Sequence, residues 1–341
     1  MAIVLFHVGV LGMEEMTWAG VSFFLMASGF LLALKYPAER IEGQGRRFAW
    51  RHAAKLYPLH WLTLIIWLVA MALLGKLVID PLTLGLNTLL LQSWSLVHAI
   101  YFSYNKFSWF LSTLLFCYLC YPLLARWFSP LRMRYKVIVL AVLVIADFII
   151  LAGSDDYSRT ALYVFPPVRL IDFLIGMTLV HVCRIIKGKS LMGKSRTGID
   201  AELVSIAMLS AMIITCRSYE NLLPWSDAIL WWIPVAMIVM TSVLYNKREG
   251  FVGRILISRP MQWLGNISFE IFILQGIAAL VYNCWVDPVL GHFGITRVAN
   301  IVSNDILGTD ANLLAVFILP IDILLAWLVN RLFTRPLARL A

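Results

Sequence analysis

Residues 18–36 of the chain read WAGVSFFLMASGFLLALKY, an apolar run that ends at a lysine and a tyrosine. Crossing the hydrocarbon core of a bilayer takes about 20 helical residues, so the run predicts a transmembrane helix over 18–34. Glycine and serine interrupt its aromatic and aliphatic residues. Small residues of this kind let two membrane helices approach closely, so the stretch also favours tight helix packing.

Similar apolar stretches recur along the chain, which therefore predicts an all-α, polytopic membrane helix bundle of about ten transmembrane helices in one domain, residues 1–341. The composition agrees: 61% of the residues are hydrophobic and 14% are charged, against roughly a quarter charged in soluble domains. Residues 79–100 are apolar but contain Pro81, Gly85 and Asn87, so we expect an interfacial or re-entrant piece there. The expected helices cover 2–12, 18–34, 57–75, 107–125, 137–153, 161–183, 201–216, 226–245, 263–284 and 312–330.

The distribution of basic residues predicts the orientation in the membrane. With the N-terminus inside, the inward connections hold 22 of the 28 Lys and Arg residues, and we therefore expect both termini in the cytoplasm. The net charge of +9 then reflects the membrane topology and favours contact with anionic lipid headgroups. It does not indicate nucleic-acid binding, because the basic residues are scattered over five loops. The inward connections are 35–56, 126–136, 184–200, 246–260 and 331–341.

Ionisable side chains inside the expected spans mark candidate sites, because each costs about 2.5–3.5 kcal/mol at the bilayer centre. Arg169 and Asp172 lie three positions apart on one helix face and can neutralise each other, which is the structural alternative to a functional role. Asp147 and Asp322 have no obvious partner and are expected to accept hydrogen bonds inside the bundle. His7 lies in MAIVLFHVGV among apolar neighbours, where it either packs with one hydrogen bond or serves in catalysis.

Cysteine and metal chemistry are not expected. The five cysteines lie in or at the ends of apolar segments and predict small packing residues. No cluster of His and carboxylate residues has the spacing of metal ligands, so no metal site is predicted.

Five motifs, in order along nearly the whole chain, resemble the membrane-bound acyltransferase 3 family. The order Gly-Val-x-Phe-Phe-x-x-x-Ser-Gly-Phe at 20–30 is similar to that family's second helix, which follows a helix carrying a His, as His7 does here. The sequence departs from many members at Leu114, where they have Glu, and at Gln275, where they have His. The other four matching segments are FAWRHAAKLYP (48–58), WFLSTLLFCYLCYP (109–122), RLIDFLIG (169–176) and LGNISFEIFILQ (264–275).

The resemblance implies an O-acyltransferase of the bacterial cytoplasmic (inner) membrane. Such an enzyme transfers an acyl group, most often acetyl from acetyl-CoA, to a hydroxyl of an exported carbohydrate or glycolipid. Acyl-CoA is polyanionic, so cations near the inner face are expected to hold its phosphates. The candidates are Arg46, Arg47, Arg51 and Lys55, whose alternative role is to enforce topology alone.

The resemblance also suggests roles for residues inside the bundle. His7 would deprotonate the acceptor hydroxyl or be transiently acylated, and Arg169 would polarise the thioester carbonyl or orient the donor. Glu270 would hold the acceptor or balance Arg169, and its alternative is a structural pair with a basic group across the bundle. The remaining residues expected to shape the site or contact substrate are Ser28, Gly29, Trp109 and Ser112.

Two other function classes remain open from the sequence. One is a transporter of a lipid-linked sugar or acylated small molecule, which would be favoured by broken helices and paired half-repeats. The other is a membrane subunit without activity. Consumption of labelled acetyl-CoA separates the enzyme from both.

Overall fold

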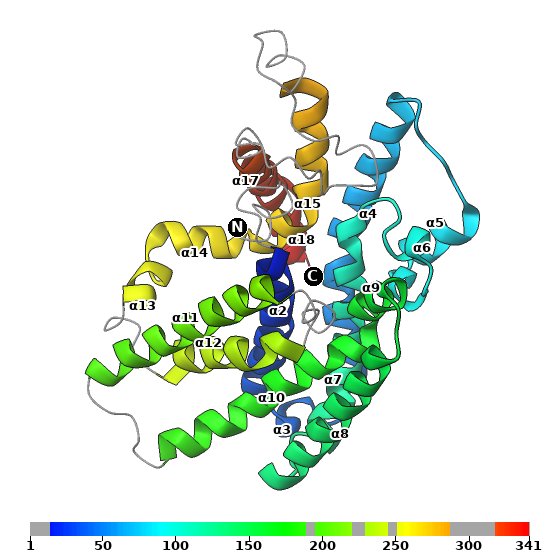
Figure 1. Cartoon of the computed structure of the whole chain (residues 1–341). Helices are drawn as coiled ribbons and strands as arrows, with labels where there is room; N and C mark the ends of the chain where they lie inside the picture. Colours follow the sequence, from blue (N-terminus) through cyan, green and yellow to red (C-terminus); the bar gives the residue numbers. More distant parts are fainter. Residues whose placement is uncertain (1–13, 189–194, 220–228, 245–250, 287–317, 341) are drawn as a thin grey trace.

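The computed structural model describes residues 14–188, 195–219, 229–244, 251–286 and 318–340. These residues form helices and connecting turns, with no strand among them (Figure 1). The longer helices are α2 (Glu14–Lys35), α4 (Gly45–Leu73), α7 (Trp109–Trp127), α8 (Met133–Ala152), α10 (Pro166–Gly188), α11 (Ser195–Ser218), α12 (Trp232–Leu244), α15 (Ser268–Val281) and α17 (Ile318–Val329). The shorter ones are α3 (Ala38–Ile41), α5 (Pro81–Thr88), α6 (His98–Tyr101), α9 (Asp156–Val164), α13 (Phe251–Leu256), α14 (Arg259–Asn266) and α18 (Arg335–Leu340), with π-helical turns at Tyr282–Val286 and Asn330–Thr334 and 3-10 turns at Gln92–Trp94, Lys106–Ser108 and Ile229–Trp231.

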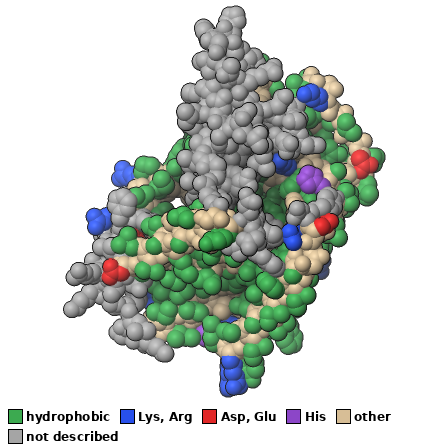
Figure 2. Space-filling view, in the orientation of Figure 1, with side chains coloured by type: hydrophobic (Ala, Val, Ile, Leu, Met, Phe, Trp, Pro, Cys, Tyr) green, Lys and Arg blue, Asp and Glu red, His purple; other side chains and the backbone are tan. Residues whose placement is uncertain are grey.

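The all-α fold is confirmed, whereas the count of about ten transmembrane helices and the cytoplasmic position of both termini stay predictions. Among the described residues, five helical stretches are long and apolar enough to cross a bilayer: Trp18–Lys35, Gly45–Leu73, Lys106–Trp127, Met133–Ala152 and Ser268–Trp285. Hydrophobic side chains dominate the described surface in Figure 2, and Lys and Arg side chains are scattered around its edges. The expected helix over 2–12 lies outside the described residues.

Several helix boundaries differ from the sequence prediction, three of them by a long extension or by a break in the helix. The helix expected over 57–75 already begins at Gly45, because the Arg, Ala and Lys residues before Pro58 are good helix formers. The helix expected over 161–183 is broken at Phe165, whose extended backbone (φ −70°, ψ 121°) is what a following proline imposes; Pro166 then starts α10. The helix expected over 263–284 is interrupted at Ile267, between α14 and α15.

Helices α2 and α10 cross in backbone contact at the centre of the bundle (Figure 1). A methyl group at Gly29 would overlap the carbonyl of Phe173 in α10, and one at Gly176 would overlap the carbonyl of Met26 in α2. Only glycine allows this approach, since it has no Cβ. The close helix packing expected from the small residues of this stretch is therefore present, and the predicted role of Gly29 in shaping a site stays a prediction.

The C-terminal end of α2 is held by α7. The hydroxyl of Tyr121 donates to the carbonyl oxygens of Leu32 (2.8 Å) and Tyr36 (2.5 Å). The Leu32 carbonyl, in the last turn of α2, also accepts from the backbone amide of Tyr36, and the Tyr36 carbonyl lies one residue beyond the end of the helix. The aromatic ring of Tyr121 also packs against Phe48 of α4, with centroids 5.1 Å apart. Three helices are thus joined at one end of the bundle.

The broken segment at 79–100 folds as short helices rather than a span, as expected. Asp80 caps α5 by accepting from the amide of Thr83 at 2.7 Å, and Pro81 occupies the first turn. Three side chains of α4 then bind the carbonyls at the end of α5: Tyr57 to Leu89 (3.1 Å), His60 to Asn87 (2.8 Å) and Trp61 to Thr88 (3.1 Å). Such partners are needed where water is scarce.

Replacing His60 by alanine is expected to destabilise the fold by about 1–3 kcal/mol, because the buried ring and its bond to the Asn87 carbonyl are both lost. Thermal unfolding in detergent, followed by dye labelling of the buried thiols of Cys117, Cys183 and Cys216, measures the change. Trp61→Phe is the control, since it removes only an exposed bond and should cost less. Equal midpoints for wild type and His60→Ala would contradict this account.

Candidate functional site

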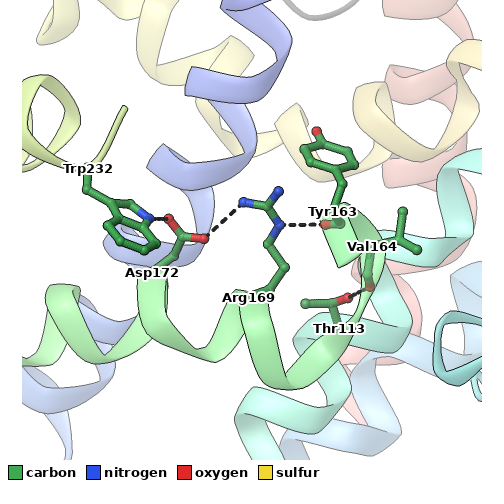
Figure 3. A network of polar contacts seen from close by, with 6 residues as sticks. All are labelled: Thr113, Tyr163, Val164, Arg169, Asp172 and Trp232. Atoms are coloured by element: carbon green, nitrogen blue, oxygen red, sulfur yellow. Dashed lines mark hydrogen bonds and ion pairs between the residues drawn. The ribbon is translucent and has the colours of Figure 1, made fainter. Parts of the chain in front are cut away.

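A buried polar network lies where α9 ends and α10 begins (Figure 3). Arg169 and Asp172 are both fully buried, and their Nη1 and Oδ2 atoms lie 3.2 Å apart. Arg169 also donates from Nε to the carbonyl of Tyr163 at 2.5 Å, and Trp232 of α12 donates from Nε1 to Asp172 Oδ1 at 2.7 Å. The pairing of Arg169 with Asp172 was predicted from their spacing and is confirmed.

Tyr163 connects this network to Trp109, a predicted site residue. The guanidinium carbon of Arg169 lies 4.3 Å from the centroid of the Tyr163 ring, and the rings of Tyr163 and Trp109 are 5.1 Å apart. Thr113, one turn along α7 from Trp109, donates to the Val164 carbonyl at 3.1 Å and fixes the end of α9 to α7. Two motifs that are far apart in sequence are thus joined through one tyrosine.

The fixed geometry of Arg169 has a chemical consequence. A guanidinium presents its donors in a rigid fork, and here one side of that fork is held by Tyr163 and another by Asp172. Its position is therefore set by the fold before any substrate arrives. A cation held in this way in a low-dielectric interior is suited to stabilise developing negative charge on an oxygen.

Asp147 of α8 lies within electrostatic range of both Arg169 and Asp172. It is buried, and neither of its carboxylate oxygens accepts a hydrogen bond within the described part of the chain. Asp322 of α17 is likewise buried without a donor among those residues. Both were expected to lie inside the bundle, which is confirmed, but the hydrogen bonds expected for them are not found among the described residues.

Glu270 has a partner of a kind that the sequence did not predict. Its Oε1 accepts from the side-chain amide of Asn330, 2.7 Å away in the π-helical turn after α17. Glu270 is thus paired with a neutral amide and not with the basic group that was the structural alternative. Of the two predicted serines, Ser112 is buried with no hydrogen bond to its hydroxyl among the described residues, and Ser28 is half-buried.

The basic residues predicted to hold acyl-CoA lie on the first turns of α4 and are exposed. A cavity of about 620 Å³ opens beside them, between α3, the start of α4 and the end of α7. Arg46 and Arg126 line this cavity, together with Glu39 and Glu42. Arg46 is one of the residues predicted to bind acyl-CoA, whereas Arg126 is not, and the predicted binding stays a prediction.

His52, which was not predicted as a site residue, lies among further cations. The positive charges of Lys55, Lys35 and Arg51 all act on its ring. The ring stacks on Phe48 at 3.9 Å and donates from Nδ1 to the Phe48 carbonyl at 2.9 Å, so its orientation is fixed. The structure thus brings Arg51 and Lys55 together with Lys35, and Arg47 lies outside both this group and the cavity lining.

Tyr163 and Trp232 were missed because each owes its position to tertiary contacts. Trp232 lies 60 positions from Asp172 in the sequence, in a helix that is mostly apolar. The proline pair at 166–167 was the only local indication that the chain would turn at Tyr163. His7, the predicted catalytic base, lies outside the described residues.

Comparison with known proteins places the chain in a family. The sequence model of the acyltransferase domain family matches residues 1–331. The chain is 30% identical over 199 residues to the acyltransferase MdmB of Streptomyces mycarofaciens, an overlap of 53% of this chain and 49% of that protein. The aligned part thus spans about half the length of this relative. No solved structure matches the chain significantly. The chain belongs to the acyltransferase 3 family of acyl-transferring enzymes.

Proposed function

We propose that the protein is an integral-membrane O-acyltransferase of the bacterial cytoplasmic membrane. It would take an acyl group, acetyl in the simplest case, from cytoplasmic acyl-CoA and transfer it to a hydroxyl of an exported or lipid-linked carbohydrate. The observation that carries the proposal is the fully buried Arg169, held between Tyr163 and Asp172 inside a bundle of this family. A guanidinium is rarely enclosed at this depth without a function.

The basic end of the bundle supports acyl-CoA as the donor. Coenzyme A carries several phosphate groups, and Arg and Lys bind phosphates through charge-assisted hydrogen bonds. Arg46 and Arg126 line the cavity, and Lys35, Arg51 and Lys55 surround His52 next to it. The cavity lining holds two arginines and two glutamates, so the excess of positive charge that suits an anionic ligand comes from the three cations around His52.

The chemistry divides between two residues. His7 takes the proton of the acceptor hydroxyl, and the hydroxyl oxygen attacks the thioester carbonyl carbon. Arg169 stabilises the negative charge that develops on the carbonyl oxygen. The C–S bond then breaks, the new ester leaves on the acceptor, and the thiolate of coenzyme A takes up the proton from His7. Atoms and charges balance without any further reactant.

The test is acetyl transfer in membranes that contain the protein. Labelled acetyl-CoA should be consumed and the label should appear on membrane or surface glycan, and His7→Ala should abolish transfer while the amount of folded protein stays unchanged. His98→Ala, at a histidine outside the bundle interior and outside the proposed machinery, is the matched control. A transporter or inactive subunit would leave acetyl-CoA untouched, and retained turnover in His7→Ala would remove that residue from the mechanism.

The cations around His52 give a separate prediction. Replacing Arg51 and Lys55 together by alanine should raise the KM for acyl-CoA by about tenfold and leave kcat nearly unchanged, because these residues bind donor and transition state equally. Initial-rate kinetics with varied acyl-CoA measure both constants. Arg134→Ala, which removes an exposed arginine at the start of α8, should change neither. A fall in kcat with constant KM would place Arg51 and Lys55 in the chemical step instead.

A further inference from the structure

A second group of cations lies apart from the cavity, where α8 begins and α10 ends. Lys136 is in the first turn of α8 and is only 3% exposed, with its ammonium 5.7 Å from the centroid of the Phe128 ring. The charged neighbours that act on it and on His181 are cationic: Arg184 acts on both, and Lys136 also acts on His181. Within the described part of the chain, no acidic side chain forms an ion pair with any of the three.

This arrangement is costly unless an anion completes it. A buried charge without a partner costs several kcal/mol, and the like charge of Arg184 adds repulsion. We propose that Lys136, His181 and Arg184 form a binding site for a phosphate group. A phosphate oxygen cluster accepts from an ammonium, an imidazole and a guanidinium at once, which would convert mutual repulsion into three charge-assisted hydrogen bonds.

The surroundings favour the headgroup of an anionic phospholipid as the source of that phosphate. From Lys136 onward, α8 presents exposed apolar side chains, among them Ile138 (55%), Val142 (60%), Ile145 (58%) and Ile149 (63%). Acyl chains lying along this face would bring a phosphate to the end of the helix where Lys136 lies. Cations at the cytoplasmic end of a membrane helix attract anionic lipid of that leaflet. The phosphates of a cytosolic nucleotide such as coenzyme A have the same chemistry and are the other source.

Ligand-induced stabilisation of the purified, delipidated full chain tests the proposal. Phosphatidylglycerol, phosphatidylcholine and coenzyme A are each added in detergent, and the unfolding midpoint is followed by thiol labelling. Wild-type protein should gain roughly 5–10 °C at a hundredfold excess over Kd of the phosphate ligand that the site takes. Lys136→Met should lose that gain, and without ligand it should unfold at the same or a higher temperature, because the buried charge is gone. Arg134→Gln, an exposed position two residues away, is the control and should keep the gain.

Comparing phosphatidylglycerol with coenzyme A distinguishes the two possible sources of the phosphate group. A gain with phosphatidylglycerol that exceeds the gain with phosphatidylcholine and is lost in Lys136→Met assigns the site to lipid, and the same pattern with coenzyme A assigns it to a nucleotide. Arg184→Gln, at an exposed side chain, repeats the test in a variant that keeps the buried packing of Lys136. If phosphatidylglycerol and coenzyme A each stabilise wild type and both variants equally, or stabilise none of them, the proposal is overturned. Neither result depends on acyl transfer, so the test of the phosphate site is independent of the test of the proposed function.

Discussion

Gly176→Leu should abolish folded protein in the membrane. At this position even a methyl group would overlap the carbonyl oxygen of Met26 and lie 2.8 Å from its carbonyl carbon. Overpacking a core usually costs about 1–3 kcal/mol when side chains can yield. Here the obstacle is the backbone of α2, so the two helices must separate and lose their shared interface. We therefore expect a larger cost, sufficient to exhaust much of the stability of about 5–15 kcal/mol that is typical of folded proteins.

The recovery of monodisperse protein after detergent extraction measures this effect. Gly29→Ala, which would meet the Phe173 carbonyl in the same interface, should show the same loss in weaker form. Gly265→Ala is the matched control: Gly265 lies in α14, is exposed, and has no atom within 4 Å of an added Cβ. It should be neutral or stabilising by about 0.5–1 kcal/mol. Normal recovery of Gly176→Leu would show that the two backbones do not meet as described.

Arg169→Lys should lower the turnover number by about 10²–10³-fold while most of the protein remains folded. Lysine keeps the positive charge next to Asp172 but lacks the planar fork that reaches Asp172 and the Tyr163 carbonyl together. The charge is then no longer fixed where the oxyanion forms. Arg169→Met, by contrast, leaves Asp172 buried without its cation and should destabilise the protein by about 3–5 kcal/mol.

A double variant separates folding from catalysis. Arg169→Gln with Asp172→Asn replaces the ion pair by two neutral amides, so stability should recover relative to Arg169→Met. Turnover should stay as low as in Arg169→Lys, because no cation is left at the reacting carbonyl. Acetyl transfer and the unfolding midpoint are measured on the same preparations. If the double variant turns over at a tenth of the wild-type rate or more, Arg169 serves structure alone.

The sequence predicted those features that depend on local spacing. Arg169 and Asp172 are three positions apart, so their pairing follows from helix geometry. The interruption of 79–100 follows from its proline and glycine. The break at Phe165 was also readable, since two prolines follow it, but a hydropathy pattern that runs through 161–183 concealed it. The early start of α4 was not predicted, because the charged residues before Pro58 end the apolar stretch although the helix already begins at Gly45.

Contacts between helices could not be predicted from the sequence. Trp232 reaches Asp172, and Asn330 reaches Glu270, from helices whose order of packing no local pattern specifies. Lys136 illustrates the limit most directly. Counted among the basic residues of an inward connection, it predicted topology alone, whereas the structure buries it between α8 and α10. A sequence shows which residues are charged, but whether a charged side chain is buried depends on the helix that packs against it.

The contact between α2 and α10 also bears on how the protein is made. A ribosome adds about 5–20 residues per second, so on the order of ten seconds pass between the synthesis of Gly29 and that of Phe173. During that interval α2 resides in the bilayer with its glycine face open to lipid or to a chaperone of membrane insertion. The arrival of α10 is therefore the event that forms the central helix contact of the nascent bundle, and release of the chain before that helix would leave a product without this contact.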